Sequence, residues 1–206
     1  MKKLGFALLM LTIALMLGGN ALAQNVGDNS VYFVTYYSNA ITAGVPDATV
    51  RVINDGDQAT TDVEGVENGT LWAAFYIFDD SQEMRSCCAC AITSDGLLSE
   101  SVNKQLTANE FTGRGEMSRG VIKLVSSSTN DPTNPVATPG LRAWGTHVQR
   151  ATNIPEGGAS YVTETRFANA NLGKIELSNL ANLCSFGLTL GSGYGYCPCT
   201  TEDFDF

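Results

Sequence analysis

The stretch Cys87-Cys88-Ala89-Cys90 decides the fold, because a second cysteine cluster lies about a hundred residues downstream at Cys184, Cys197 and Cys199. In an oxidising compartment, an even number of cysteines indicates disulfide bonds before it indicates metal ligands. Adjacent cysteines and Cys-x-Cys pairs fit bridge geometry poorly, so we expect every bond to run between the clusters. That rule leaves six of the fifteen possible pairings open. The arrangement predicts that disulfide bonds tie the middle of the chain to its end.

The N-terminal segment has the three parts of a secretion signal. Lys2 and Lys3 form a basic start, residues 4–17 form an apolar run, and Ala21-Leu22-Ala23 forms a small-residue cleavage site. The run is too short to span a bilayer comfortably, and the expected new N-terminus, Gln24, is not a cysteine that could carry a lipid. We therefore expect residues 1–23 to be removed. The mature protein is expected to be secreted or held at the cell surface without membrane insertion.

The expected mature chain, residues 24–206, is strongly acidic. Removal of the signal leaves 10 basic and 21 acidic side chains, a net charge of -11. A field of that sign repels nucleic acid and anionic membranes, so we expect neither as a partner. A chain of this length can bury a substantial core without covalent help, so the disulfide bonds indicate a demand for durability.

Apolar and β-branched runs recur at the spacing of an all-β sandwich. Two of them, residues 31–38 and 71–78, are apolar on both faces, which predicts strands that are covered on both sides. The predicted strands lie at residues 31–38, 48–54, 71–78, 91–93, 97–102, 121–125 and 161–167, and residues 141–150 fit a strand or a helix. The proline-rich and serine-rich residues 126–140 predict a long surface loop within a single secreted β-rich domain, residues 24–206.

The C-terminal third contains the periodicity of a helix. Leu177, Leu180, Cys184 and Leu188 recur at spacings of three and four, which predicts a helix over residues 172–190 with Cys184 directed at the core. The predicted fold is therefore a mainly β, disulfide-stapled β sandwich with one C-terminal helix.

We expect no catalytic residue and no cofactor. His147 is the only histidine and the chain has no Gly-x-Ser-x-Gly motif, so neither a serine hydrolase triad nor a histidine metal site is predicted. Asp79 and Asp80 end an apolar strand, but adjacent strand residues point to opposite faces, so a solvated strand end is the expected role.

Two metal sites remain as alternatives. Asp55, Asp57, Asp62 and Glu64 form an oxygen-rich loop that is a weak calcium candidate, because its spacing is not that of an EF-hand and a plain polar turn is the preferred explanation. The second alternative is a thiolate site, because Cys87 and Cys90 have the C-x-x-C spacing.

Three strings in this chain resemble secreted, cysteine-rich bacterial proteins of unassigned function. They are CCAC at residues 87–90, LRAWGTHVQ at residues 141–149 and GSGYGYCPC at residues 191–199. The resemblance extends over the mature chain and implies secretion, but it implies no activity.

These observations favour a non-enzymatic structural or adhesive surface protein, whose partners are other copies of itself or other surface proteins. The first strand offers a strand-addition interface through which such a protein could build an extracellular filament, formed by Val31, Tyr32, Phe33, Val34, Tyr36 and Tyr37. The alternative for this strand is a place in the sheet of its own subunit. Two alternative functions are a thiolate metal-binding or thiol redox protein, and a carboxylate-based extracellular hydrolase.

Overall fold

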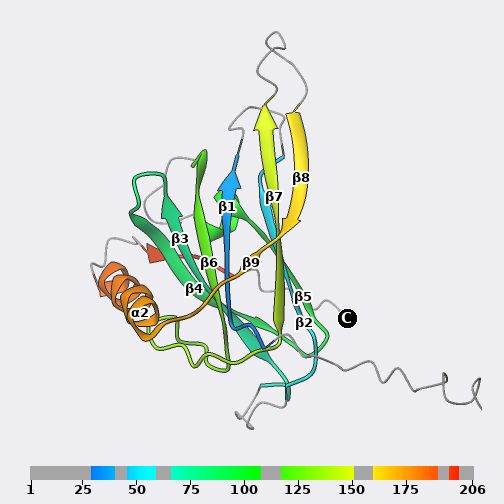
Figure 1. Ribbon diagram of the computed structural model, residues 1–206, viewed down its shortest axis with the longest axis vertical. Coiled ribbons are helices and arrows are strands. Elements are labelled where there is room, and N and C mark those ends of the chain that lie inside the picture. The colour runs from blue at the N-terminus through cyan, green and yellow to red at the C-terminus, as the bar shows by residue number, and fades with distance from the viewer. Residues whose placement is uncertain are drawn as a thin grey trace, which may run out of the picture.

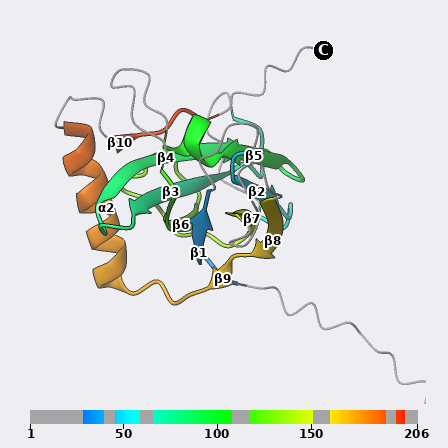
Figure 2. The same ribbon diagram turned by 90° about the horizontal axis from the view of Figure 1, so that it is seen from above.

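A computed structural model describes residues 29–39, 46–58, 66–107, 117–150, 160–189 and 195–199. Within these residues, two β-sheets pack face to face and one α-helix covers the outer face of the larger sheet (Figure 1). Seen from above, the layers follow one another as helix, larger sheet and smaller sheet (Figure 2). The predicted mainly β fold with a C-terminal helix is confirmed.

The larger sheet, sheet A, has the strand order β10-β4-β3-β6-β1-β9. Its strands are β1 (Tyr32–Ser38), β3 (Leu71–Asp79), β4 (Met84–Ile92), β6 (Arg119–Ser127), β9 (Ala168–Asn169) and β10 (Gly195–Tyr196). Neighbours in sheet A are antiparallel except β10, which runs parallel to β4.

The smaller sheet, sheet B, is antiparallel and has the order β5-β2-β7-β8. Its strands are β2 (Thr49–Asn54), β5 (Leu97–Ser101), β7 (Leu141–Arg150) and β8 (Ser160–Arg166). A single π-helical turn, η1 (Val102–Leu106), follows β5, and the helix α2 (Lys174–Thr189) follows β9.

Sheet A carries apolar side chains on both faces, and another layer of the protein packs against each face. Its inner face packs against sheet B through side chains that include Phe33, Phe75 and Leu124. Its outer face packs against Leu180 and Cys184 of α2. All of the first seven residues of β3 are buried as a result. This arrangement confirms the prediction that residues 31–38 and 71–78 belong to strands covered on both sides.

The structure extends one strand that the sequence predicts only in part. β4 begins at Met84 and carries the whole first cysteine cluster, whereas the sequence indicates a strand only at residues 91–93. Ser86, Ala89 and the cysteines are small and carry no β-branched or aromatic signal, so pattern reasoning stops short of them. The ambiguous residues 141–150 form β7, a strand.

The segment between β6 and β7 is hydrogen-bonded to itself and to sheet A. The Ser128 amide donates to the Val136 carbonyl at 3.0 Å, and the Thr138 amide donates to the Ser126 carbonyl at 2.9 Å. The Tyr76 hydroxyl donates to the Pro132 carbonyl at 2.8 Å, which fastens this loop over the outer face of β3. Among the described residues, no helix is long and apolar enough to cross a membrane.

Candidate functional site on the outer face of sheet A

The six cysteines form three disulfide bonds, all of them between the two clusters as predicted. Cys87 bonds to Cys184, Cys88 to Cys197 and Cys90 to Cys199. The Cα–Cα distances of 5.8, 5.4 and 5.4 Å lie within the usual disulfide range. The structure thus selects one of the six pairings that the sequence leaves open.

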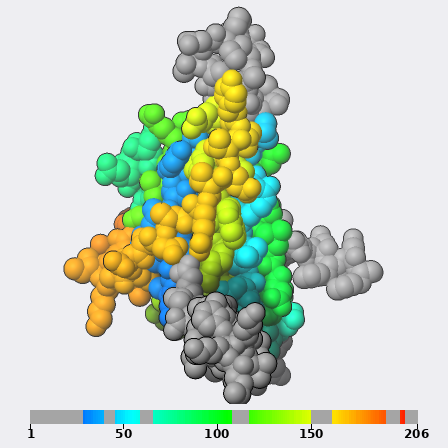
Figure 3. Space-filling model, turned by 45° about the vertical axis from the view of Figure 1, so that its right-hand side comes forward, coloured from blue at the N-terminus to red at the C-terminus, as the bar shows by residue number. Residues whose placement is uncertain are grey.

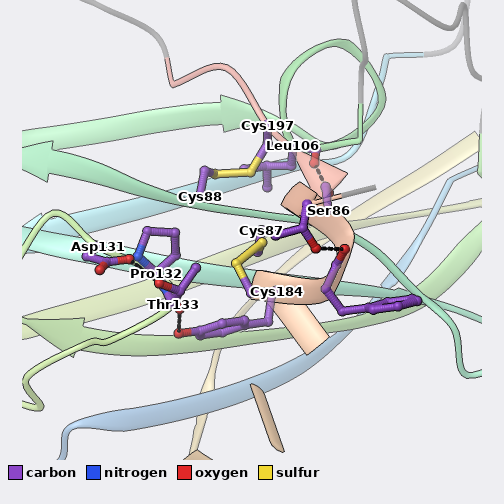
Figure 4. The surroundings of a disulfide bond; sticks show 12 residues. Ser86, Cys87, Cys88, Leu106, Asp131, Pro132, Thr133, Cys184 and Cys197 are labelled. Carbon is purple, nitrogen blue, oxygen red and sulfur yellow. Dashed lines mark hydrogen bonds between the residues drawn. A yellow bond between two sulfur atoms is a disulfide. The ribbon is translucent and has the colours of Figure 1, made fainter. Parts of the chain in front are cut away.

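The alternation of side chains along β4 explains this selection. Cys87 points to the outer face, where it meets α2, while Cys88 and Cys90 point into the core between the sheets. Figure 4 shows the neighbouring Cys87 and Cys88 directed to different sides, one to Cys184 and the other to Cys197. A strand over residues 86–90 places Cys87 on one face and Cys88 and Cys90 on the other. This alternation is the sequence signal that distinguishes Cys87 from the other two cysteines.

Three cysteine sulfur atoms lie close enough to one another to suggest a metal site. The Sγ atoms of Cys88, Cys90 and Cys199 lie within 4.8 Å of one another. Metal binding requires thiolates, whereas all three sulfur atoms are in disulfide bonds. The thiolate alternative therefore depends on reduction of these bonds.

A polar cluster, not predicted from the sequence, joins the N-terminal end of α2 to sheet A. Glu176 in the first turn of α2 accepts a 2.8 Å hydrogen bond from the Tyr32 hydroxyl and pairs with Lys123 Nζ at 2.6 Å. The ammonium group of Lys123 also lies 5.0 Å from the centroid of the Phe78 ring. The hydrogen bond from Lys123 holds the pKa of Glu176 below its usual range. Burial, reinforced by the hydrogen bond to Glu176, raises the pKa of Tyr32 well above its usual range.

The six residues of the predicted strand-addition interface lie in β1 or directly before it. In this structure β1 pairs along its whole length with β6 of its own sheet. Tyr32, Phe33 and Tyr37 are buried, whereas Tyr36 is 55% exposed. The structure thus places the strand within its own subunit, which is the alternative that the sequence left open.

The second edge of β1 is only half covered among the described residues. β9 pairs with Phe33 and Val34 there, and its neighbour Ala170 donates to the Tyr32 carbonyl at 3.0 Å. Beyond β9, the exposed ring of Tyr36 stacks on the ring of His147 from β7, with 4.2 Å between centroids. Figure 1 shows β9 crossing the lower part of β1 while the upper part runs beside β7.

The only histidine has a structural environment. His147 is 1% exposed, and its Nε2 lies 2.7 Å from the hydroxyl oxygen of Thr165. Burial lowers the pKa of His147, so the neutral ring is favoured in the folded protein. Its Nδ1 has no hydrogen-bond partner among the described residues.

Of the calcium candidates, Asp55 and Asp57 are described, while Asp62 and Glu64 lie outside the described residues. The carboxylate of Asp55 forms an ion pair with Arg142 at 3.0 Å and also accepts a 3.3 Å hydrogen bond from the Asp57 amide. The guanidinium already neutralises the charge that a calcium ion would need from Asp55. The described part of the loop therefore has the geometry of a polar turn.

Asp79 and Asp80 lie at a strand end as expected, but only Asp80 is solvated, because Asp79 is 8% exposed. Asp79 accepts 2.9 Å hydrogen bonds from the amides of Ser81 and Glu83 and pairs with Arg85 at 2.9 Å. Asp80 forms an exposed ion pair with Arg119 at 2.9 Å. The two carboxylates thus stabilise the β3–β4 turn and its surroundings.

Asp47 is a structural carboxylate that the sequence did not single out. It accepts hydrogen bonds from the Asn103 amide at 2.7 Å and from the side chains of Asn39 and Ser101. The Asn103 amide belongs to the first turn of η1, so Asp47 supplements the N-cap of that turn, Ser101, whose side chain accepts from the Lys104 amide.

No family model, no curated protein and no solved structure matches this chain. The resemblance to secreted cysteine-rich bacterial proteins therefore stays a prediction.

Proposed function

We propose that this protein is a non-enzymatic structural or adhesive protein, secreted or held at the cell surface. The observation that carries the proposal is the set of three disulfide bonds between β4 and the C-terminal segment, over sequence separations of 97, 109 and 109 residues. Disulfide bonds persist in oxidising compartments. They oppose unfolding most where the loops that they close are long. A chain of this size can fold without them, so resistance to unfolding outside the cell is the role that they support.

The engagement of the ionisable side chains supports a role other than catalysis. Asp55, Asp79 and Glu176 each hold a cation of their own chain and organise a turn or a helix contact. Glu176 in particular is a poor general base, because the hydrogen bond from Lys123 holds its pKa below the usual range.

Mass spectrometry of the secreted, unreduced and alkylated protein tests the proposal. We expect cleavage after Ala23 and a mass that shows three bonds and no alkylated thiol. We also expect the oxidised protein to survive protease treatment that degrades the reduced and alkylated protein. An intracellular protein with free thiols and bound metal would overturn the proposal in favour of the thiolate alternative.

A filament subunit is the more specific form of the proposal. β1 contributes Tyr32 to the helix-covered face and Phe33 to the core between the sheets, so exchange of this strand between subunits would link two folded domains with the same contacts. Electron microscopy of the secreted material tests it. Ordered filaments support strand exchange, and uniform monomers oppose it.

Deletion of residues 24–38 separates the two places for β1. If subunits exchange the strand, the truncated protein mixed with intact protein is expected to accept β1 from an intact copy and to end filament growth, because it has no strand to donate. If the strand belongs to its own sheet, its loss exposes both cores and aggregation is expected.

A further inference from the structure

The side of α2 that faces away from sheet A carries large, exposed apolar side chains. Only Leu180 and Cys184 of this helix are buried, whereas Ile175 is 80% exposed and Phe186 is 64% exposed. Eleven residues correspond to about three helical turns, so Ile175 and Phe186 lie on one line along the outer face. Figure 3 shows α2 standing out from the side of the molecule.

We propose that this line is an interface through which two copies of the chain pair. It consists of Ile175, Asn179, Asn182 and Phe186, all of them exposed, and is called the outer stripe below. The pairing deepens the proposed structural role and rests on it, because self-association is a property of structural and adhesive proteins. It does not depend on strand exchange.

The outer stripe is complementary to itself when two helices run antiparallel. Ile175 and Phe186 are equally far from the midpoint between Leu180 and Ala181, and so are Asn179 and Asn182. A two-fold axis at that midpoint brings Ile175 against Phe186 of the partner subunit. In such an interface each contact occurs twice, once from each subunit.

The same axis brings Asn179 against Asn182 of the partner subunit. Each amide side chain both donates and accepts hydrogen bonds, so two asparagines can pair. The stripe therefore matches apolar groups with apolar groups and amides with amides, which identifies a second copy as its occupant.

The charge distribution favours the same occupant. The expected mature chain has a net charge of -11, so most faces of two copies repel each other, but residues 177–189 of α2 carry no charged side chain. Lys174, exposed at the N-terminus of α2, is unfavourable beside the positive end of its own helix dipole. In the antiparallel pair it lies beside the C-terminal, negative end of the partner's helix, so the charges are complementary.

The Cys87–Cys184 bond holds α2 in the orientation that exposes the outer stripe. Cys184 is fully buried on the side of α2 that faces sheet A, so the covalent bond holds the helix from behind and leaves the outer stripe free. A helix that is already held in place loses little conformational entropy when a second copy docks.

Sedimentation equilibrium of the oxidised mature protein, over a concentration series, tests the interface with two charge variants. We expect Ile175→Lys alone and Phe186→Asp alone to raise the dimer dissociation constant about tenfold or more. We expect an equimolar mixture of the two to dimerise again. In the mixed dimer the introduced lysine of one subunit faces the introduced aspartate of the other, and the unchanged Phe186 faces the unchanged Ile175. Val162→Lys and Val162→Asp are matched controls, because Val162 is a 50% exposed apolar residue of β8 outside the stripe.

A monomeric wild-type protein overturns the inference, and so does a dimer that both single variants leave intact. A mixture that stays monomeric overturns the antiparallel register. Circular dichroism and the protease resistance of the same variants verify that each one folds. These two measurements, with the mass of the secreted protein, also distinguish the two failures. A wild-type protein that is monomeric but has intact disulfide bonds and protease resistance refutes the interface alone, whereas free thiols or intracellular retention refutes the proposed function.

Discussion

The hydroxyl of Tyr32 in β1 donates a 2.8 Å hydrogen bond to Glu176 Oε1 in α2, although 144 residues separate them along the chain. Lys123 of β6 pairs with the same oxygen atom at 2.6 Å. The first strand, a central strand and the last helix therefore meet at one carboxylate, which fastens α2 at the end opposite to the region of Cys184.

Glu176→Gln is expected to destabilise the protein at neutral pH and to have no effect in acid. Lys123 lowers the pKa of Glu176 in the folded protein, so this carboxylate adds stability above its unfolded pKa of about 4.3 and loses it as the pH falls through the lower folded value. Because the pair is partly exposed, we expect a loss of about 1 kcal/mol or less at pH 7. Urea unfolding at pH 7 and at pH 3 measures the difference. Glu83→Gln, at an exposed turn position, is the control, and an equal loss at both pH values would contradict the role of the ion pair.

Cys87→Ala/Cys184→Ala is expected to release α2 while the sandwich stays folded. With the other two bonds in place, the Cys87–Cys184 bond closes an additional loop through the twelve residues between Cys184 and Cys197, which corresponds to about 3 kcal/mol. Hydrogen exchange should show faster exchange of the α2 amides and unchanged protection of β3. Cys90→Ala/Cys199→Ala is the control, because that bond holds the tail beyond α2. Unchanged protection of α2 in the first variant would show that packing alone retains the helix.

Gly120→Ala is expected to destabilise the sheet strongly. A Cβ atom at this position would lie 2.0 Å from the Phe78 carbonyl oxygen and 2.6 Å from the Tyr37 hydroxyl oxygen, so the backbone of β3 or β6 must move. We expect a cost of about 3 kcal/mol, at the upper end for overpacked cores. Thermal unfolding measures it. Gly173→Ser is the contrasting variant, because nothing lies within 4 Å of its Cβ position and serine is a better N-cap for α2. A Gly120→Ala protein as stable as the wild type would mean that this close approach does not exist.

His147 is expected to make the fold sensitive to mild acid. Burial lowers the pKa of His147 in the folded protein, so the unfolded chain binds its proton first, near pH 6.5. Stability therefore falls as the pH drops from about 6.5 toward the lower folded value. His147→Phe keeps a ring for Tyr36 to stack on and removes the titration, so its stability should change less over this range. Denaturant unfolding at several pH values provides the test, and parallel curves for both proteins would exclude His147 as the cause.

Much of the fold could be predicted because strands and helices leave periodic patterns. Val50 and Val52 alternate with Thr49 and Arg51, and the structure buries the valines while leaving the other two partly exposed. The spacing of Leu177, Leu180, Cys184 and Leu188 predicted a buried side of α2, and the structure buries Leu180 and Cys184 but leaves Leu177 partly exposed and Leu188 exposed. These patterns are local, since neighbouring residues alone determine which side chains share a face.

The candidate sites could be predicted less well because they depend on distant partners. Nothing near Glu176 in the sequence indicates Tyr32 or Lys123, and nothing near Asp47 indicates the amide of Asn103 that it caps. Strand pairing between β1 and β6 brings such groups together across most of the chain.

The amino-acid sequence alone determined the mainly β architecture, the single C-terminal helix and the rule that bonds run between the cysteine clusters, because hydrophobic period and disulfide geometry act over a few residues. Only the tertiary structure decided that Cys87 bonds to Cys184 and Cys88 to Cys197. The reason is that β4 directs neighbouring side chains to opposite faces, and each face meets a different part of the C-terminal segment once the sheet has formed.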